Sequence, residues 1–307
     1  MATTVVAPVS NSIALAQKYL PLLDEVYKVN SRSAVLDTAN DRVRWIGADT
    51  VKMLALTEVG LGQYSRNSGF VPGNTNGAWE TFQIAQDRGR SYQIDVMDNE
   101  ETLGMAVGNL LGEVERIHVV PEVDCYRFAK YASTDGIDGG TGDITVGSTN
   151  VKNLISAAEA SMDNNEVPSE GRILFISPRC KDGLKGNIER RIINSEANVS
   201  YEVEYFDGMR VITVPQGRFT TTCTLAEPTA ANGNGGFTAG GKRINFMIIH
   251  PSAVMQVVKH VAPRLFSPEQ NIEADAWRLN YRIYHDCFVL PNKKKGIYAY
   301  VDSTASN

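Results

Sequence analysis

Two strand-like segments near the start of the chain are separated by a stretch that is too long and too irregular for a hairpin turn. The segments are Val51–Leu56 and Trp79–Ile84, and between them Gly60–Gly77 (GLGQYSRNSGFVPGNTNG) is rich in Gly, Asn and Ser without a hydrophobic period. Connections longer than about 12–15 residues that lack secondary structure are uncommon in compact domains. We therefore expect residues 40–97 to form an extended two-stranded loop that projects from the body.

Such a loop needs a surface to lie on, because an isolated two-stranded ribbon is only marginally stable in water. The side chains that would contact this surface are one cation at the tip and the apolar residues of the returning strand. These candidates are Arg66, Trp79, Phe82 and Ile84. At the base of the loop, Asp87-Arg88-Gly89-Arg90 places Asp87, Arg88 and Arg90 where they could meet charged groups of an adjacent chain. A pair of solvated charges is the equally plausible alternative.

The segment before the loop has the pattern of an amphipathic helix. From Ser12 to Val29, apolar residues that include Leu20, Leu23 and Tyr27 recur at steps of three or four, and Pro21 is expected to kink the helix. A helix followed by a polar stretch, away from other elements, must bury its apolar stripe elsewhere. We expect residues 1–39 to form an arm that contacts another copy of the chain.

The longest helical pattern covers Asp98–Ala132, with an apolar stripe that Pro121 is expected to interrupt. Gly104, Gly108 and Gly112 recur on one face of it. Because each glycine costs a helix about 1 kcal/mol relative to Ala, this spacing predicts close contact with another backbone.

The remainder of the chain predicts an α/β region and a strand-rich tail, and hence an α+β fold. Pro178 and Pro251 stand where short helices should begin, the second running through Val258. The Gly-rich segment 227–241 is expected to be a flexible insert. The other predicted elements are a helix capped by Asn150, strands at 172–177, 210–215 and 244–249, and tail strands at 276–289 and 296–301.

Composition excludes several classes of function. The net charge of −5 lacks the basic excess of nucleic-acid-binding domains, and Lys293-Lys294-Lys295 is expected to be a solvated hairpin turn. The four cysteines have no metal-ligand spacing. No apolar run reaches the ~18 residues of a membrane span, and no signal peptide precedes the arm. We expect no metal, no cofactor, no membrane contact and synthesis in a cytoplasm.

A catalytic interpretation of Tyr284-His285-Asp286-Cys287 is weak. On a strand, His285 and Cys287 share one face while Asp286 points to the other, and no local group would orient the pair. The glycine clusters lack the Lys-Ser/Thr of a phosphate-binding loop. A soluble α/β enzyme nevertheless stays open as an alternative.

Five stretches in this order resemble the major capsid proteins of tailed, siphophage-like bacteriophages with the Hong Kong 97-type fold. They are Val119–Phe128, Phe206–Pro215, Asn245–Val254, Arg282–Asp286 and Lys295–Ala299. The resemblance implies an N-terminal arm (1–39), an extended loop (40–97), a peripheral domain with a long spine helix (98–148 and 263–307) and an α/β axial domain (149–262). About 35 residues before the loop are too few for a large fused scaffold domain, and the start at Met1 suggests that no scaffolding segment is cleaved.

The same resemblance implies an icosahedral shell of hexamers and pentamers around double-stranded DNA. Expected partners are copies of the chain, a portal, and scaffold or decoration proteins, with weak nonspecific DNA contact on the inner face. The shell of an encapsulin-like nanocompartment is the alternative. Some relatives join a loop Lys to an Asn of a neighbour, but Gly60–Gly77 contains no Lys, and Lys52 lies on the rising strand. We therefore expect no covalent cross-linking, which a denaturing gel of mature particles would test.

Overall fold

The protein is described by a computed structural model. It describes residues 31–37, 44–46, 49–57, 60–61, 63–64, 66–67, 69–70, 76–97, 112, 114–194, 200–227 and 235–305. The expected arm helix, with Leu20, Leu23 and Tyr27, lies outside these residues, as does the first part of the expected long helix.

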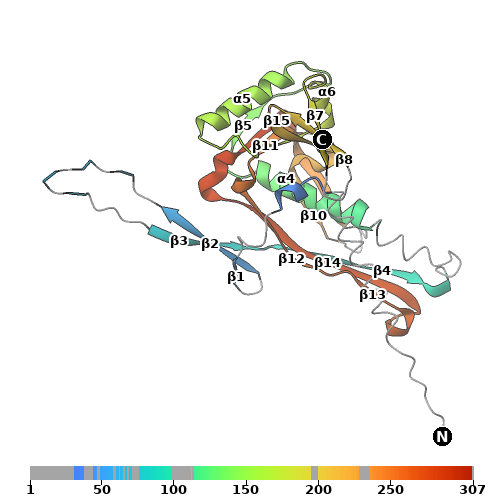
Figure 1. Ribbon diagram of the computed structural model, residues 1–307. Coiled ribbons are helices and arrows are strands. Elements are labelled where there is room, and N and C mark those ends of the chain that lie inside the picture. The colour runs from blue at the N-terminus through green and yellow to red at the C-terminus, as the bar shows by residue number, and fades with distance from the viewer. Residues whose placement is uncertain are drawn as a thin grey trace, which may run out of the picture.

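The upper part of the molecule is built on an eight-stranded sheet with helices on both faces (Figure 1). The main path of the sheet is β5-β15-β11-β6-β9-β8-β7, and β10 also pairs with β11. The strands are β5 Asp138–Thr141, β6 Ile173–Ile176, β7 Glu189–Asn194, β8 Ser200–Phe206, β9 Met209–Thr213, β10 Thr220–Ala226, β11 Gly236–Ile249 and β15 Ile297–Ala305.

The sequence of β6 explains why helices cover both faces of this sheet. All four of its residues are buried. Phe175 packs into a cluster with Phe128 of the helix α4 (Val120–Ala132), whereas Leu174 packs against Ile155 of the helix α5 (Val151–Asn164) on the other face. A strand buried on both faces reads as a continuous apolar run, so the predicted buried strand is confirmed.

The helices of this part follow the sequence with two corrections. Pro178 opens α6 (Pro178–Asp182), as predicted. The helix predicted after Asn150 is confirmed as α5, but the Asn150 side chain makes no capping hydrogen bond. The expected interruption at Pro121 is wrong, because the π-helical turn η3 (Glu115–Val119) leads directly into α4. A π turn shifts the backbone bonding from i−4 to i−5, which accommodates the proline ring.

The lower part is a long four-stranded sheet, centred on β14 (Ala276–Val289) and seen at the bottom of Figure 1. β4 (Gln86–Asp95) pairs with β14 along one edge, while β12 (Val254–Val261) and β13 (Arg264–Phe266) pair along the other. The helix expected through Val258 is therefore wrong beyond the 3-10 turn Pro251–Ala253. The four valines of β12 favour a pleated, half-buried strand, and pairing with β14 decides the outcome.

A third sheet forms the projecting element. β2 (Thr50–Thr57) and β3 (Asn76–Gln83) pair over their whole length, from Thr50 opposite Gln83 to Thr57 opposite Asn76. The short strand β1 (Arg44–Ile46) adds to β2. We call β1–β3 and their connections the flap. It extends away from the body in Figure 1. The expected two-stranded loop is thus confirmed as a projection but has three strands, and β4 belongs to the body.

Two further expectations need correction. Gly236–Gly241, expected to be a flexible insert, begins β11 and pairs with β10, a strand that the sequence did not reveal. The expected domain boundaries do not follow the sheets, because β12 joins the lower sheet and β15 the upper one. The tail strands and the Lys-rich turn η7 (Pro291–Gly296) are confirmed. The other short turns are η1 Ala34–Leu36, η4 Gln216–Arg218 and η6 Pro268–Gln270.

Candidate assembly surfaces

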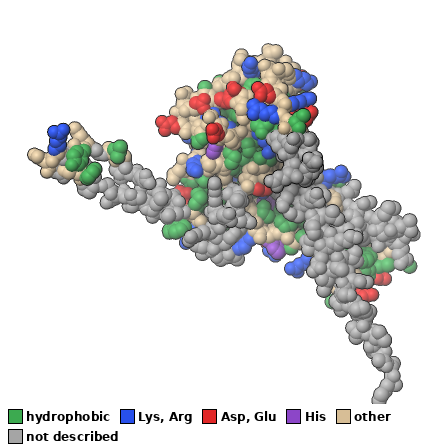
Figure 2. Space-filling view, viewed as in Figure 1, with side chains coloured by type: hydrophobic (Ala, Val, Ile, Leu, Met, Phe, Trp, Pro, Cys, Tyr) green, Lys and Arg blue, Asp and Glu red, His purple; other side chains and the backbone are tan. Residues whose placement is uncertain are grey.

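The tip of the flap exposes apolar side chains far from any core. Leu61 is 107% exposed, Phe70 88% and Tyr64 56%. The Tyr64 and Phe70 rings contact each other edge to face, with 5.0 Å between their centroids. Figure 2 shows these hydrophobic side chains and a basic one at the end of the projection, where Arg66 is also exposed. Apolar side chains gathered on a projection indicate a contact surface for another molecule.

The base of the flap is fixed to its own body. Ile84 is 3% exposed and lies in an apolar cluster with Val257 and Phe288 of the lower sheet. Phe82 packs on Phe288, with 5.0 Å between the ring centroids. Trp79, further along β3, is 54% exposed. Of the apolar strand residues proposed as contacts, Trp79 is therefore accessible to a neighbour, Phe82 is partly covered, and Ile84 is buried within its own chain.

A buried carboxylate ties this base to the spine helix α4. Asp286 is 1% exposed and accepts hydrogen bonds from Lys130 Nζ at 2.5 Å and Tyr126 Oη at 2.9 Å. It also accepts one from the backbone N–H of Ala85 at 3.0 Å. Ala85 lies between the end of β3 and the start of β4, so Asp286 connects α4, β14 and the base of the flap. Burial and the Asp286 carboxylate raise the pKa of Tyr126 above its usual range.

The neighbours of Asp286 on β14 are not arranged as an activated nucleophile. His285 is 1% exposed, and burial lowers its pKa to about 3, so the imidazole is neutral. Burial raises the pKa of the Cys287 thiol to about 12. A reactive cysteine needs the opposite environment, with a lowered pKa and solvent access. Both side chains therefore belong to the core.

The charged residues at the start of β4 find partners within their own chain. Arg88 Nε donates to Glu122 Oε1 of α4 at 2.8 Å, and its NH2 donates to the carbonyls of Ala226 and Gly236 at 3.1 and 3.2 Å. Asp87 accepts from Arg282 at 2.8 and 2.5 Å. The acidic partner expected for Arg88 on an adjacent subunit is therefore present on its own helix. That guanidinium is consumed in joining β4, α4 and the β10–β11 hairpin.

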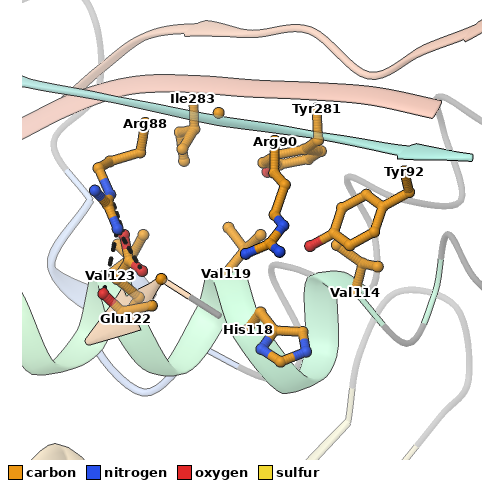
Figure 3. A pocket seen from close by; sticks show the side chains of 13 residues that line it. Arg88, Arg90, Tyr92, Val114, His118, Val119, Glu122, Val123, Tyr281 and Ile283 are labelled. Atoms are coloured by element: carbon orange, nitrogen blue, oxygen red, sulfur yellow. Dashed lines mark hydrogen bonds and ion pairs between the residues drawn. The ribbon is translucent and has the colours of Figure 1, made fainter. Parts of the chain in front are cut away.

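Arg90 lines an open groove between the lower sheet and α4 (Figure 3). The groove has a volume of about 400 Å³. Val119 and Ile283 contribute apolar surface, while Arg90 and His118 point toward each other across it in Figure 3. The Arg90 guanidinium lies 5.8 Å from the Tyr92 ring centroid. This mixture of apolar walls and cationic groups suits contact with a protein surface.

Within the described residues, no group of acidic, His and Cys side chains could hold a metal ion. Among those residues there is also no helix with the length and apolar character to cross a membrane.

Comparison with known proteins identifies the fold. No family model and no curated protein matches the sequence. A solved chain from Gordonia phage Cozz aligns with a TM-score of 0.59 and 12% identity, over 90% of this chain and 87% of that one. The capsid structure of cyanophage P-SCSP1u gives 0.51 and 14%, over 84% of each chain. A virus-like particle from Pyrococcus furiosus gives 0.53 and 12%, over 93% and 99%. The chain has the Hong Kong 97-type capsid fold.

Within this capsid fold, sequence reasoning missed the residues that hold the end of the arm. Asp124 on α4 is fully buried and accepts hydrogen bonds from Ser31 Oγ at 2.8 Å, Ser33 Oγ at 2.7 Å and the Arg32 N–H at 3.0 Å. Arg127, also fully buried, donates to Ser33 Oγ at 2.8 Å. Two oppositely charged residues three positions apart on the buried face of a helix were the available signal, because such residues are rarely buried without partners.

The capsid fold thus has three candidate contact surfaces. They are the flap tip with Arg66, the exposed outer part of β3 with Trp79, and the groove lined by Arg90. The structure does not bring them together, because the tip lies at the end of the projection and the groove lies against α4 (Figures 1 and 3). Surfaces at separate places on one chain suit contacts with several neighbours.

Proposed function

We propose that the chain is the structural subunit of an icosahedral bacteriophage head, assembling into hexamers and pentamers that enclose double-stranded DNA. The observation that carries the proposal is the flap, which projects from a capsid-type body and has Leu61 and Phe70 almost fully exposed at its tip. An isolated chain leaves this apolar surface in water. A neighbouring copy would cover it.

In the proposed shell each part of the chain has a place. The axial domain (149–262) surrounds the centre of each capsomer, and the peripheral domain (98–148 and 263–307) lies between capsomers. The extended loop (40–97) crosses the adjacent subunit, and the arm (1–39) passes beneath another. The head is assembled in the host bacterial cytoplasm around a portal, with scaffold or decoration proteins where the particle uses them.

Many weak contacts would hold such a shell together. Apolar area buried at an interface contributes about 25 cal/mol per Å², and permanent assemblies commonly bury more than about 2,000 Å² per interface. The role is structural and not catalytic, and the burial of His285 and Cys287 supports this over a soluble enzyme. Contact with DNA on the inner face is weak and nonspecific, because the net charge of −5 gives little attraction for phosphates.

A nanocompartment shell is the second candidate, and it is favoured by one observation. The virus-like particle from Pyrococcus furiosus aligns over 99% of its own length. A shell of this kind would enclose protein cargo. Several solved structures with the same fold are described as phages or phage capsids, which favours the phage head.

Electron microscopy and absorbance of purified particles test the proposal together. Particles from infected or induced host cells should be closed shells with DNA-like absorbance at 260 nm that survives nuclease treatment. Closed shells that contain protein and no nuclease-protected DNA would favour the nanocompartment. A chain that remains a small oligomer at every concentration would contradict both candidates.

A further inference from the structure

Two cysteines that are far apart in the sequence meet where α4 packs against β10. Cys125 lies on α4 and Cys223 on β10, and both are free thiols. The Cys223 thiol donates a hydrogen bond to the sulfur of Cys125. Cys125 Sγ also lies 4.0 Å from Thr220 Oγ1 on the same strand. The two sulfur atoms are therefore direct neighbours.

The local structure explains how the two side chains come to face each other. Along β10, Thr222 and Thr224 are exposed while Cys223 between them is half-buried. Because side chains alternate along a strand, Cys223 lies on the inward face. Cys125 lies on the buried face of α4 with 0% exposure, and α4 packs along β10.

The backbones on both sides are held in place close to the thiols. Glu122, one turn before Cys125, binds Arg88. The same Arg88 binds the carbonyls of Ala226 and Gly236, which are opposite each other at the end of the β10–β11 hairpin. A disulfide requires two cysteines whose Cα atoms are already close and stay so. The Arg88 contacts supply this constraint.

We propose that Cys125 and Cys223 form an intrachain disulfide when the protein meets a low-molecular-weight disulfide oxidant such as oxidised glutathione. Cys223, the accessible thiol, first attacks the oxidant as its thiolate. A mixed disulfide forms on Cys223 and one glutathione thiol is released. The Cys125 thiolate then attacks the Sγ of Cys223, and the second glutathione thiol leaves. Two protein thiols are oxidised and one glutathione disulfide is reduced to two thiols.

The thiol–thiol hydrogen bond prepares the second step. Donation from Cys223 lowers the pKa of Cys125 and raises that of Cys223, so the buried sulfur carries the negative charge. The thiolate is the attacking species in disulfide exchange. The other two buried cysteines, Cys180 and Cys287, have thiols whose pKa is raised by burial.

The bond would lock the β10–β11 hairpin of the upper sheet onto the spine helix. The timing rests on the proposed function, since a head assembled in a reducing cytoplasm is released into an oxidising medium. The chemistry itself does not depend on assembly. Because the bond closes a long loop, the oxidised protein should melt about 5–10 °C higher than the reduced protein.

The test uses the full-length protein, purified under reduction and then equilibrated natively with oxidised glutathione. Free thiols are counted after unfolding, and the linked peptides are identified by mass spectrometry. The expected result is a fall from the four thiols of the sequence to two, with one peptide pair joining Cys125 to Cys223. On a non-reducing gel the product should remain a monomer that migrates faster.

Two variants complete the design. Cys180→Ser, which removes a buried cysteine away from the pair, should still lose two thiols, whereas Cys223→Ser should lose none. The wild-type peptide map decides the question even if a variant folds poorly. Four thiols that stay free, a persistent glutathione adduct on Cys223, or a different linked pair would each overturn the proposal. The chain's ability to form shells is a separate measurement, so failure here leaves the proposed function untouched.

Discussion

At the scale of single residues, Asp124 is the contact on which the end of the arm depends. It is fully buried and accepts hydrogen bonds from Ser31, Arg32 and Ser33. Arg218 NH1 lies 3.4 Å from the same carboxylate. Removal of one partner from such a buried charged network leaves the others unpaired, which costs about 3–5 kcal/mol.

We therefore expect Asp124→Ala to lower the free energy of unfolding by about 3–5 kcal/mol and to expose residues 31–37 to protease. Urea unfolding of the unassembled subunit and limited proteolysis measure the two effects. Asp135→Ala is the matched control, because Asp135 is exposed and its loss should change stability by under about 0.5 kcal/mol. Equal stability of the two variants would show that Asp124 does not anchor the arm.

His285 makes stability depend on pH in a defined direction. Its pKa is about 3 in the folded chain and about 6.5 when unfolded. Between these values the unfolded chain binds a proton that the folded chain does not, so stability falls as the pH is lowered from 6.5. The loss is about 1.4 kcal/mol per pH unit. The charged groups that influence this pKa are Arg127, Lys130 and Arg88, which lower it, and Asp286, which raises it.

His285→Phe removes the titrating group and keeps a ring of similar size. We expect the variant to lose less stability than wild type as the pH falls from 6 to 5, by about 1.4 kcal/mol. Urea unfolding at a series of pH values measures the difference. Parallel stability curves would mean that the buried imidazole is protonated in the folded chain.

At the scale of elements, Asp286 controls how firmly the base of the flap is attached. It joins Lys130 and Tyr126 of α4 to the backbone N–H of Ala85. Asp286→Asn keeps the shape but loses the charge, and a hydrogen bond to a charged group contributes about 1.5–3 kcal/mol. We expect faster hydrogen exchange at residues 84–86 in the variant, measured by mass spectrometry.

Asp302→Asn is the control for this effect. Asp302 is 6% exposed and binds Arg179, but it lies on β15 in the upper sheet. Its replacement should lower the overall stability and leave the protection of residues 84–86 unchanged relative to the rest of the chain. The same loss of protection in both variants would assign the effect to global destabilisation.

The elements that could be predicted from sequence are those whose pattern has a local cause. The apolar run of β6 and the proline that opens α6 identify themselves. The strand β12 does not, because its valines fit a helical stripe as well as a strand and only pairing with β14 decides between them. β10, rich in Thr, was hidden beside a Gly-rich segment that completes its hairpin.

The contact surfaces show the same limit. The projection was predictable, because no compact hairpin accommodates its long connection. The burial of Ile84 was not, because it depends on Val257 and Phe288, which are distant in sequence. The partners of Arg88 were also hidden, because Glu122, Ala226 and Gly236 come from three separate elements.

At the scale of the whole molecule, the flap tip should matter for assembly and not for folding. Phe70 is 88% exposed, so Phe70→Ser should change the stability of the subunit by under about 0.5 kcal/mol. Burial of a Phe at an interface contributes about 1.5–3 kcal/mol, so the yield of particles should fall at least about tenfold. Density-gradient sedimentation measures this yield. Val146→Ser, at a body residue that is 70% exposed, should assemble normally. Full assembly of Phe70→Ser would remove the tip from the contact surface.

The central claim is that the flap is completed by neighbouring copies of the chain. Hydrogen exchange of the same preparation, measured before and after assembly, tests it most directly. The backbone amides of β2 and β3 should exchange quickly in the free subunit and become strongly protected in closed shells, while those of β6 stay protected in both. Strong protection of β2 and β3 in the free monomer, with no further change on assembly, would contradict the claim.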